Sequence, residues 1–406
     1  MARDDLPRMH SPTPEIRLLV DALAPRGGSR VDYRHWGPAR WESALAAAEW
    51  HRVAPLLFRH LDRTPYVPTW VTARLEERYL ANAARNIFVT DELRRVLAAL
   101  AAVDIPVMPL KGAALIEMVY PDPALRELFD LDLLVPVDRL AEAEAILLES
   151  GYEDDPAAYG DEPSPRALRA NDHHEAGLVH RTRVTAIELH RQITIAGEGK
   201  PFNVGEIWDR AEPSASQPTC MLPAPEDLLL HVTLHFTRNR LGGSAHLSLT
   251  GGALAQIADI AWLARGTNID WDTFAATALE YGLGLRVFLA LFAAAELGIE
   301  IPGRVLTMLR PAGFDAALGR QLVALRVLRT NRHLGVQSLR RALAPSRQVL
   351  TDEWQAGTRD WRSLTRAYVR RVRTRAPQIR YALRRPFAEI QDYRIAGQIR
   401  ALEERS

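Results

Sequence analysis

The chain has 406 residues, a formal net charge of +1, 47% hydrophobic residues and 25% charged residues. These proportions are those of a folded globular protein, and they exclude a chain that is mainly disordered, collagenous or coiled coil. The length predicts two or three packed units rather than a single domain.

Cysteine usage and hydropathy indicate the cellular setting. Cys220 is the one cysteine, so the chain cannot form an internal disulfide or a zinc cluster of several thiolates. Charge or proline interrupts each apolar stretch before the roughly 20 residues that a membrane span needs. The first residues lack the basic and then apolar order of a secretory signal. We therefore expect a cytoplasmic protein without a membrane span.

Lysine is scarce in this chain. Of the 51 lysines and arginines, lysine stands only at positions 111 and 200. A compact ammonium and a planar guanidinium are not interchangeable. A lysine that survives such a bias is expected where arginine would not serve, so Lys111 becomes important if it lies in a motif.

The first hundred residues predict a helical unit. Apolar residues recur three and four apart in the segments 14–23, 44–50 and 71–100. We expect Trp36, Trp41 and Trp50 to pack this unit rather than to stack on a ligand.

The next segment predicts a small α+β unit with a mixed sheet. Its expected elements are a short buried strand at 105–110, a helix at 112–120, a strand at 128–135, a helix at 139–149 and a hairpin of 173–180 with 184–191. Asp138 is expected to cap the second helix, and Gly151 to close it. Residues 153–172 read as a long loop between that helix and the hairpin.

Helices are predicted again further along the chain, at 226–236, 252–265, 271–281 and 285–297. The overall expectation is an α+β fold in which helical regions flank the small sheet. Its units are an N-terminal helical region (1–100), a sheet core (101–215), a helical domain that closes the cleft (216–335) and an arginine-rich helical tail (336–406).

The tail carries ten arginines against one acid between positions 359 and 385. Such a stripe could follow a phosphate backbone. A net charge near zero favours instead a contact with the protein's own acidic surface or the docking of a carrier protein or peptide.

The most informative motif is Asp130-Leu131-Asp132 on a predicted strand. Strand side chains alternate, so both carboxylates emerge on one face. Two carboxylates this close repel each other unless a cation lies between them, and Mg²⁺ prefers such oxygen ligands. The alternative is a solvated edge face, although aspartate is a poor strand former.

Two further motifs favour metal and phosphate chemistry. Lys111-Gly112 joins a strand to a helix, where backbone N–H groups at the helix start and the ammonium beside them suit a phosphate. Glu188 and His190 share one face of the second hairpin strand. A third carboxylate from an adjacent strand is what a two-metal phosphoryl-transfer site requires.

The remaining polar candidates are less specific. Substrate hydrogen bonding or packing explains His174 and His190 better than zinc ligation does. His231 and His235 lie one helical turn apart and are expected to line the cleft. Asp259, within an apolar helix, could pair with an arginine or face the site.

Together these motifs resemble the nucleotidyltransferase superfamily that includes DNA polymerase β. They look more closely like a nucleotidyltransferase-like family with Leu-Lys-Gly, an arginine, Asp-h-Asp and h-Glu-h-His, where h is apolar. The matching segments are 110–112, Arg126, 130–135 and 187–190, and the resemblance covers about residues 80–305. The wider superfamily carries Gly-Ser or Gly-Gly at the helix start. This chain has alanine after Gly112, so either Lys111 takes over the phosphate contact or the donor is held differently.

The resemblance implies an enzyme that uses Mg²⁺ or Mn²⁺ to move a nucleoside monophosphate from an NTP to an acceptor. The implied metal and catalytic residues are Asp130, Asp132 and Glu188, and the implied substrate-binding residues are Lys111, Gly112, Arg126, His174 and His190.

The acceptor is expected to be a peptide or small molecule rather than nucleic acid. Relatives often lie near genes for peptide natural products, which suggests a modified peptide. The alternatives are transfer of another group to a phosphorylated peptide, or a non-catalytic nucleotide-binding scaffold or sensor. Three mutually repelling carboxylates argue against the non-catalytic alternative.

Overall fold

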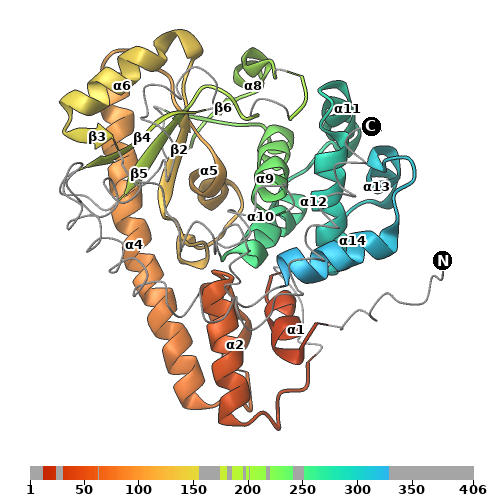
Figure 1. Ribbon diagram of the computed structural model, residues 1–406. Helices are drawn as coiled ribbons and strands as arrows, with labels where there is room; N and C mark the ends of the chain where they lie inside the picture. The colour runs from red at the N-terminus through yellow and green to blue at the C-terminus, as the bar shows by residue number, and fades with distance from the viewer. Residues whose placement is uncertain are drawn as a thin grey trace, which may run out of the picture.

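The computed structural model is mainly helical and is built around one small mixed sheet (Figure 1). It describes residues 12–23, 31–62, 64–154, 174–180, 185–194, 198–200, 202–215, 220–240 and 251–328. Over these ranges, none of the helices combines the length and apolar character needed to cross a membrane. The predicted α+β class is confirmed.

The N-terminal region is helical, as predicted. Its helices are α1 (Pro14–Asp21), α2 (Pro38–Trp50), α3 (Ala54–Leu61) and the long α4 (Thr69–Ala101). A proline stands at the first or second position of α1, α2 and α3, where its missing N–H costs no helical hydrogen bond. Trp36 and Trp41 are buried with ring centroids 5.0 Å apart, which confirms that they pack this region.

The main sheet has five strands in the order β1-β2-β5-β4-β3. They are β1 (Met108–Pro109), β2 (Asp130–Leu134), β3 (Tyr152–Asp154), β4 (His174–His180) and β5 (Ala186–His190). Strand β2 pairs parallel with β5, and the other neighbours pair antiparallel. The predicted hairpin is therefore confirmed as β4 and β5. Strand β3 was missed, because its three residues carry two acids and no apolar alternation.

Two helices accompany the first strands, α5 (Lys111–Met118) and α6 (Leu140–Glu149). The predicted cap of α6 was wrong. Asp138 lies within a 3₁₀ turn, Val137–Arg139, and α6 begins without a side-chain cap. Pro136 starts this turn, so the aspartate lacks the extended backbone of an N-cap. Gly151 does close α6, with the left-handed φ of 93° that a helix stop favours.

The C-terminal region packs helices on the opposite side of the sheet from α4 and α6 (Figure 1). Its elements are α8 (Val204–Asp209), α9 (Pro225–Arg240), α10 (Ala253–Gly266), α11 (Trp271–Glu280), α12 (Gly284–Glu296), α13 (Gly303–Leu309), α14 (Ala316–Leu322) and the short strand pair β6 (Glu212–Pro213) and β7 (Met221–Leu222). The four helices predicted in this region are confirmed as α9 to α12. The arginine-rich tail lies outside the described residues, and the four-unit division stays a prediction.

The two faces of the sheet differ in chemistry. Leu131 and Leu133 of β2 join a buried apolar cluster with the second half of α4 and with α6. Leu134 belongs to a second cluster, shared by α5, α9 and the N-terminal helices. Because strand side chains alternate, Asp132 lies on this second face, toward α5 and α9.

Helix α4 fixes the loop that leads into β2. Tyr79 donates to the Asp122 carboxylate at 2.6 Å, and the Asn82 amide donates to the Ala124 carbonyl at 2.7 Å. The Asn86 amide donates to the carbonyls of Pro123 and Arg126 at 2.6 and 2.8 Å. These bonds satisfy loop carbonyls that have no partner in a sheet ladder, and they hold the loop in place.

An ion pair joins this loop to α10. The Arg126 guanidinium donates from Nε and Nη2 to the two carboxylate oxygens of Asp259, at 2.8 and 2.9 Å. Tyr120 also donates to Asp259, at 2.9 Å. The side chains of Arg126 and Asp259 are only 16% and 4% exposed, so the pair is largely removed from water. Asp259 thus pairs with an arginine, and it also lines the pocket described below, so both alternatives given for it are observed.

This ion pair yields a stability prediction. Asp259→Ala should lower the free energy of unfolding by about 3–5 kcal/mol, because it leaves the buried Arg126 charge uncompensated. Urea denaturation of both proteins measures the difference. The matched control is Glu42→Ala, which breaks the exposed pair with Arg74 and should cost at most about 1 kcal/mol. Equal losses in the two variants would contradict the assignment.

Candidate metal and nucleotide site

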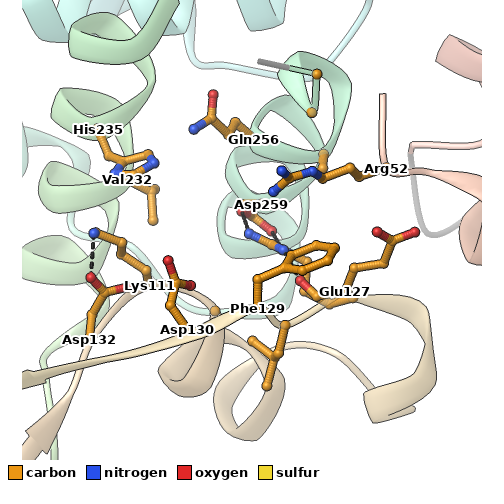
Figure 2. Close-up of a pocket in the computed structure, with 16 residues that line it drawn as sticks. Arg52, Lys111, Glu127, Phe129, Asp130, Asp132, Val232, His235, Gln256 and Asp259 are labelled. Atoms are coloured by element: carbon orange, nitrogen blue, oxygen red, sulfur yellow. Dashed lines mark hydrogen bonds and ion pairs between the residues drawn. The ribbon is translucent and has the colours of Figure 1, made fainter. Parts of the chain in front are cut away.

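A pocket opens where the polar face of the sheet meets the helical layer. It is lined by residues from the α2–α3 turn, the start of α5, the loop into β2, β2 itself, and helices α9 and α10. Figure 2 shows Lys111, Asp130 and Asp132 on one side of this pocket, and Arg52, Glu127 and Phe129 on the other. The pocket therefore has an acidic end and a basic, aromatic end.

The pairing register of β2 and β5 brings the carboxylates of the acidic end together. Asp132 of β2 pairs directly with Glu188 of β5 in the parallel ladder, and Asp130 pairs with Ala186. Neighbouring residues on adjacent strands project to the same face, so the carboxylates of Asp132 and Glu188 come together. Asp132 is almost fully buried, Glu188 is partly buried, and Asp130 is exposed in the pocket.

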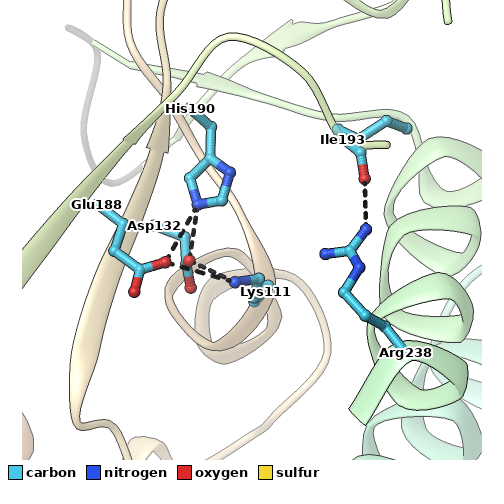
Figure 3. A network of polar contacts seen from close by, with 6 residues as sticks. All are labelled: Lys111, Asp132, Glu188, His190, Ile193 and Arg238. Atoms are coloured by element: carbon cyan, nitrogen blue, oxygen red, sulfur yellow. Dashed lines mark hydrogen bonds and ion pairs between the residues drawn. The ribbon is translucent and has the colours of Figure 1, made fainter. Parts of the chain in front are cut away.

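Two cationic groups contact the Asp132 carboxylate (Figure 3). Lys111 Nζ donates to Asp132 Oδ1 at 2.5 Å and lies 4.0 Å from Glu188 Oε2. His190 Nε2 donates to the same Asp132 oxygen at 2.8 Å and lies 3.6 Å from Glu188 Oε2. One buried oxygen thus accepts hydrogen bonds from both groups.

The pKa values follow from this crowding. Burial alone would raise the pKa of Asp132, but Lys111 and His190 outweigh it and hold that pKa well below its usual range. Burial alone would lower the pKa of Lys111 and of His190, and the carboxylates raise both instead. The contacts in this buried network therefore favour the charged form of each of the three groups.

Asp130 shifts in the other direction. Desolvation in the pocket, followed by repulsion from Asp132, raises the pKa of Asp130 to about 6. Lys111 and Arg126 oppose this shift without cancelling it. Without a further cation, the acidic end therefore holds more carboxylates than its own positive groups can balance.

The donor set fits a divalent metal ion. One ligand atom each from Asp132, Glu188 and His190 lies within 4.8 Å of the others. Carboxylate oxygens suit Mg²⁺, and an added imidazole nitrogen makes the set suitable for Mn²⁺ as well. Among the described residues this group does not include Asp130, so the predicted role of Asp130 in metal binding stays a prediction.

The turn before α5 presents Lys111 to the acidic end. Lys111 is the first residue of α5 and has a left-handed φ of 44°, which is uncommon for a residue with a long side chain. Gly112 follows it, and a Cβ at that position would lie 2.4 Å from Leu128 Cδ2. A side chain at this position would force Leu128 to shift, so glycine permits the close contact between this turn and the loop into β2.

The basic end combines guanidinium groups with an aromatic ring. Arg52 and Arg85 lie over the Phe129 ring at 4.4 and 5.0 Å from its centroid. Arg126 reaches the pocket wall while paired with Asp259. The sequence reasoning missed Arg52 and Phe129, since neither residue lies in a recognisable motif.

The predicted histidines fall in three different environments. His235 lines the pocket, whereas His231 is buried with its ring 6.2 Å from that of His190. Burial, with the nearby Lys111 charge, lowers the pKa of His231 well below its ordinary value. His174 pairs with His190 in the β4–β5 ladder, and its side chain lies outside what the structure describes.

Residues 37–298 match the profile of a protein family described as an uncharacterised nucleotidyltransferase. The chain belongs to this family. The match contains α2 to α12, so it includes the whole sheet and the pocket. No curated protein matches the chain. The family assignment confirms the resemblance seen in the motifs and supports nucleotidyl transfer as the general class of activity.

The raised pKa of Asp130 predicts that removing this carboxylate will stabilise the folded protein. Near pH 4 this carboxyl is mostly protonated in the folded state but only partly protonated in the unfolded state, where its pKa is the usual 3.8. As the pH rises from about 4 to 6, the folded state retains a proton that the unfolded state has lost. Stability from this group therefore falls as pH rises through that window. Asp130→Asn removes the penalty, so in the presence of a chelator it should melt at a higher temperature than the wild type at pH 7.5.

Thermal unfolding at pH 7.5 and pH 4 measures this effect. The difference should be much smaller at pH 4 than at pH 7.5, and the exposed control Asp138→Asn should show none at either pH. A lower melting temperature for Asp130→Asn at pH 7.5 would show that Asp130 is not under electrostatic strain.

Proposed function

We propose that this protein is a divalent-metal-dependent nucleotidyltransferase that moves a nucleoside monophosphate from an NTP to an acceptor hydroxyl. The observation that carries the proposal is the parallel register of β2 and β5. It brings Glu188 beside Asp132, which lines one end of a pocket whose other end is basic. The family assignment supports the same chemistry.

Each side chain of the acidic end has a role in this reaction. Asp130 and Asp132 would hold metal on the side of the NTP, and Glu188 would complete the site on the side of the acceptor. Bound Mg²⁺ or Mn²⁺ supplies charge neutralisation for the triphosphate and lowers the pKa of a coordinated hydroxyl. His190 orients Asp132 through its 2.8 Å hydrogen bond.

The rest of the pocket suits the triphosphate. Lys111 and the backbone at Gly112 are placed at a helix start, where a phosphate is favoured. Arg126 and Arg52 add positive charge on the opposite side of the pocket. Catalysis by these groups would consist mainly of positioning and charge stabilisation, as is usual for phosphoryl transfer.

For the acceptor, we propose a peptide or small molecule rather than nucleic acid. The lining of the described pocket includes the acids Glu127, Asp130, Asp132 and Asp259 as well as its positive residues. Such a surface does not offer the continuous basic track that a nucleic-acid backbone needs.

The first test is nucleotidyl transfer itself. Incubation with α-³²P-labelled NTPs and Mg²⁺ or Mn²⁺, with and without candidate peptides, should label the acceptor and release pyrophosphate. Asp132→Asn should reduce the rate at least about 100-fold, because it removes a metal-holding charge while preserving side-chain shape. The control Asp138→Asn should retain wild-type activity. Undiminished labelling by a folded Asp132→Asn protein would place the chemistry elsewhere, and nucleotide binding without transfer would favour a scaffold or sensor.

The second test concerns the shape of the cation at position 111. The tight turn and the 2.5 Å contact with Asp132 leave limited room for a guanidinium. Lys111→Arg should therefore impair turnover nearly as much as Lys111→Ala does. Steady-state kinetics of the two variants measure this, and Lys200→Arg with Lys200→Ala serve as controls at the other, exposed lysine. Near wild-type activity of Lys111→Arg would show that charge alone suffices.

A further inference from the structure

The ammonium of Lys111 lies among the side chains that could hold a metal ion. Its ammonium contacts the same Asp132 oxygen that His190 contacts, and it lies 4.0 Å from the Glu188 carboxylate. These carboxylates and His190 are the group whose ligand atoms gather closely enough to hold a metal. The side chain of Lys111 is 14% exposed, so its charge is balanced mainly by these protein groups.

The backbone holds Lys111 in this position. Its left-handed φ is a conformation that residues other than glycine, asparagine and aspartate seldom adopt. Such conformations persist where the surrounding structure enforces them, and they concentrate at functional sites. Here the adjoining Gly112 packs closely on Leu128, which fixes the turn against the loop into β2.

We infer that Lys111 acts as an internal cation in the metal-free protein, and that a divalent ion must displace it from Asp132. This inference rests on the proposed metal site. A ligand oxygen lies about 2.0–2.1 Å from Mg²⁺. An ion on Asp132 Oδ1 would therefore lie at most about 4.6 Å from the ammonium. Two cations so close in a buried site repel strongly.

The displaced ammonium has a destination in the same pocket. Lys111 lines the pocket together with Asp130, Arg126 and His235. Its flexible four-carbon stem lets the ammonium turn away from Asp132 toward the pocket interior, where the triphosphate of a bound NTP supplies the replacement negative charge. Metal binding and nucleotide binding then reinforce each other. The ion replaces the ammonium as the cation beside Asp132, and the triphosphate replaces Asp132 as the anion beside the ammonium.

The competing arrangement leaves Lys111 in place. In it, the ion binds the other oxygen of Asp132 together with Asp130, and the ammonium keeps its hydrogen bond. The two arrangements differ in whether Lys111 opposes metal binding and in whether its side chain moves.

Metal affinity in the absence of nucleotide tests the opposition. Mn²⁺ binding followed by electron paramagnetic resonance should be about tenfold tighter or more in Lys111→Met than in the wild type, because a neighbouring positive charge is removed. The control Lys200→Met should bind as the wild type does. Adding a non-hydrolysable NTP analogue should strengthen Mn²⁺ binding more in the wild type than in Lys111→Met. Equal or weaker binding by Lys111→Met without nucleotide would overturn the inference.

Movement of the side chain is tested on the wild-type protein, independently of how the variant folds. Because the chain has two lysines, labelling with ¹³C-lysine gives two Cε signals in NMR spectra, and Lys200 is an internal reference. The Lys111 signal should shift on titration with Mg²⁺ while the Lys200 signal stays. Mg²⁺ binding with an unchanged Lys111 signal would overturn the displacement alone. Absence of divalent-ion binding in the wild type and in Lys111→Met would overturn the proposed metal site as well.

Discussion

The buried carboxylate of Asp132 is the group on which the rest of the site depends. An ionised carboxylate that is almost fully buried is costly unless opposite charges and hydrogen bonds compensate it. Compensation comes from Lys111 at the start of α5 and from His190 on β5, which contact one oxygen. The charge balance around Asp132 therefore depends on both the β2–β5 pairing and the α5 turn.

A second buried ion pair stabilises the opposite wall of the pocket. Arg126 and Asp259 join the loop into β2 to α10, while side chains of α4 hold the same loop from the other side. The pocket is thus built between layers of the fold, and ion pairs rather than a single rigid element fix the distance between its walls. Its separate acidic and basic ends match a substrate that carries both bound metal and exposed phosphate oxygens.

Local patterns predicted most of the elements that surround this pocket. The 3.6-residue periodicity gave α4 and the helices α9 to α12, and the spacing of two apolar runs gave the β4–β5 hairpin. The failures have local causes. Strand β3 is short and acidic, and Pro136 starts a 3₁₀ turn that removes Asp138 from a capping position. For Asp138, the backbone of the turn that Pro136 starts overrides the capping preference of aspartate itself.

The sequence by itself determined that Asp130 and Asp132 share a strand face, that Glu188 and His190 share another, and that Lys111 precedes a glycine at a strand-to-helix turn. Each of these facts depends on neighbours in the chain, so alternation and turn chemistry are sufficient to derive it. Only the tertiary structure decided that Asp132 lies beside Glu188, that His190 rather than Asp130 completes the close group, and that Arg126 pairs with Asp259. These contacts depend on which strands pair, in which register, and on which helix covers them. That choice is made by burial summed over the whole chain, and no local period encodes it.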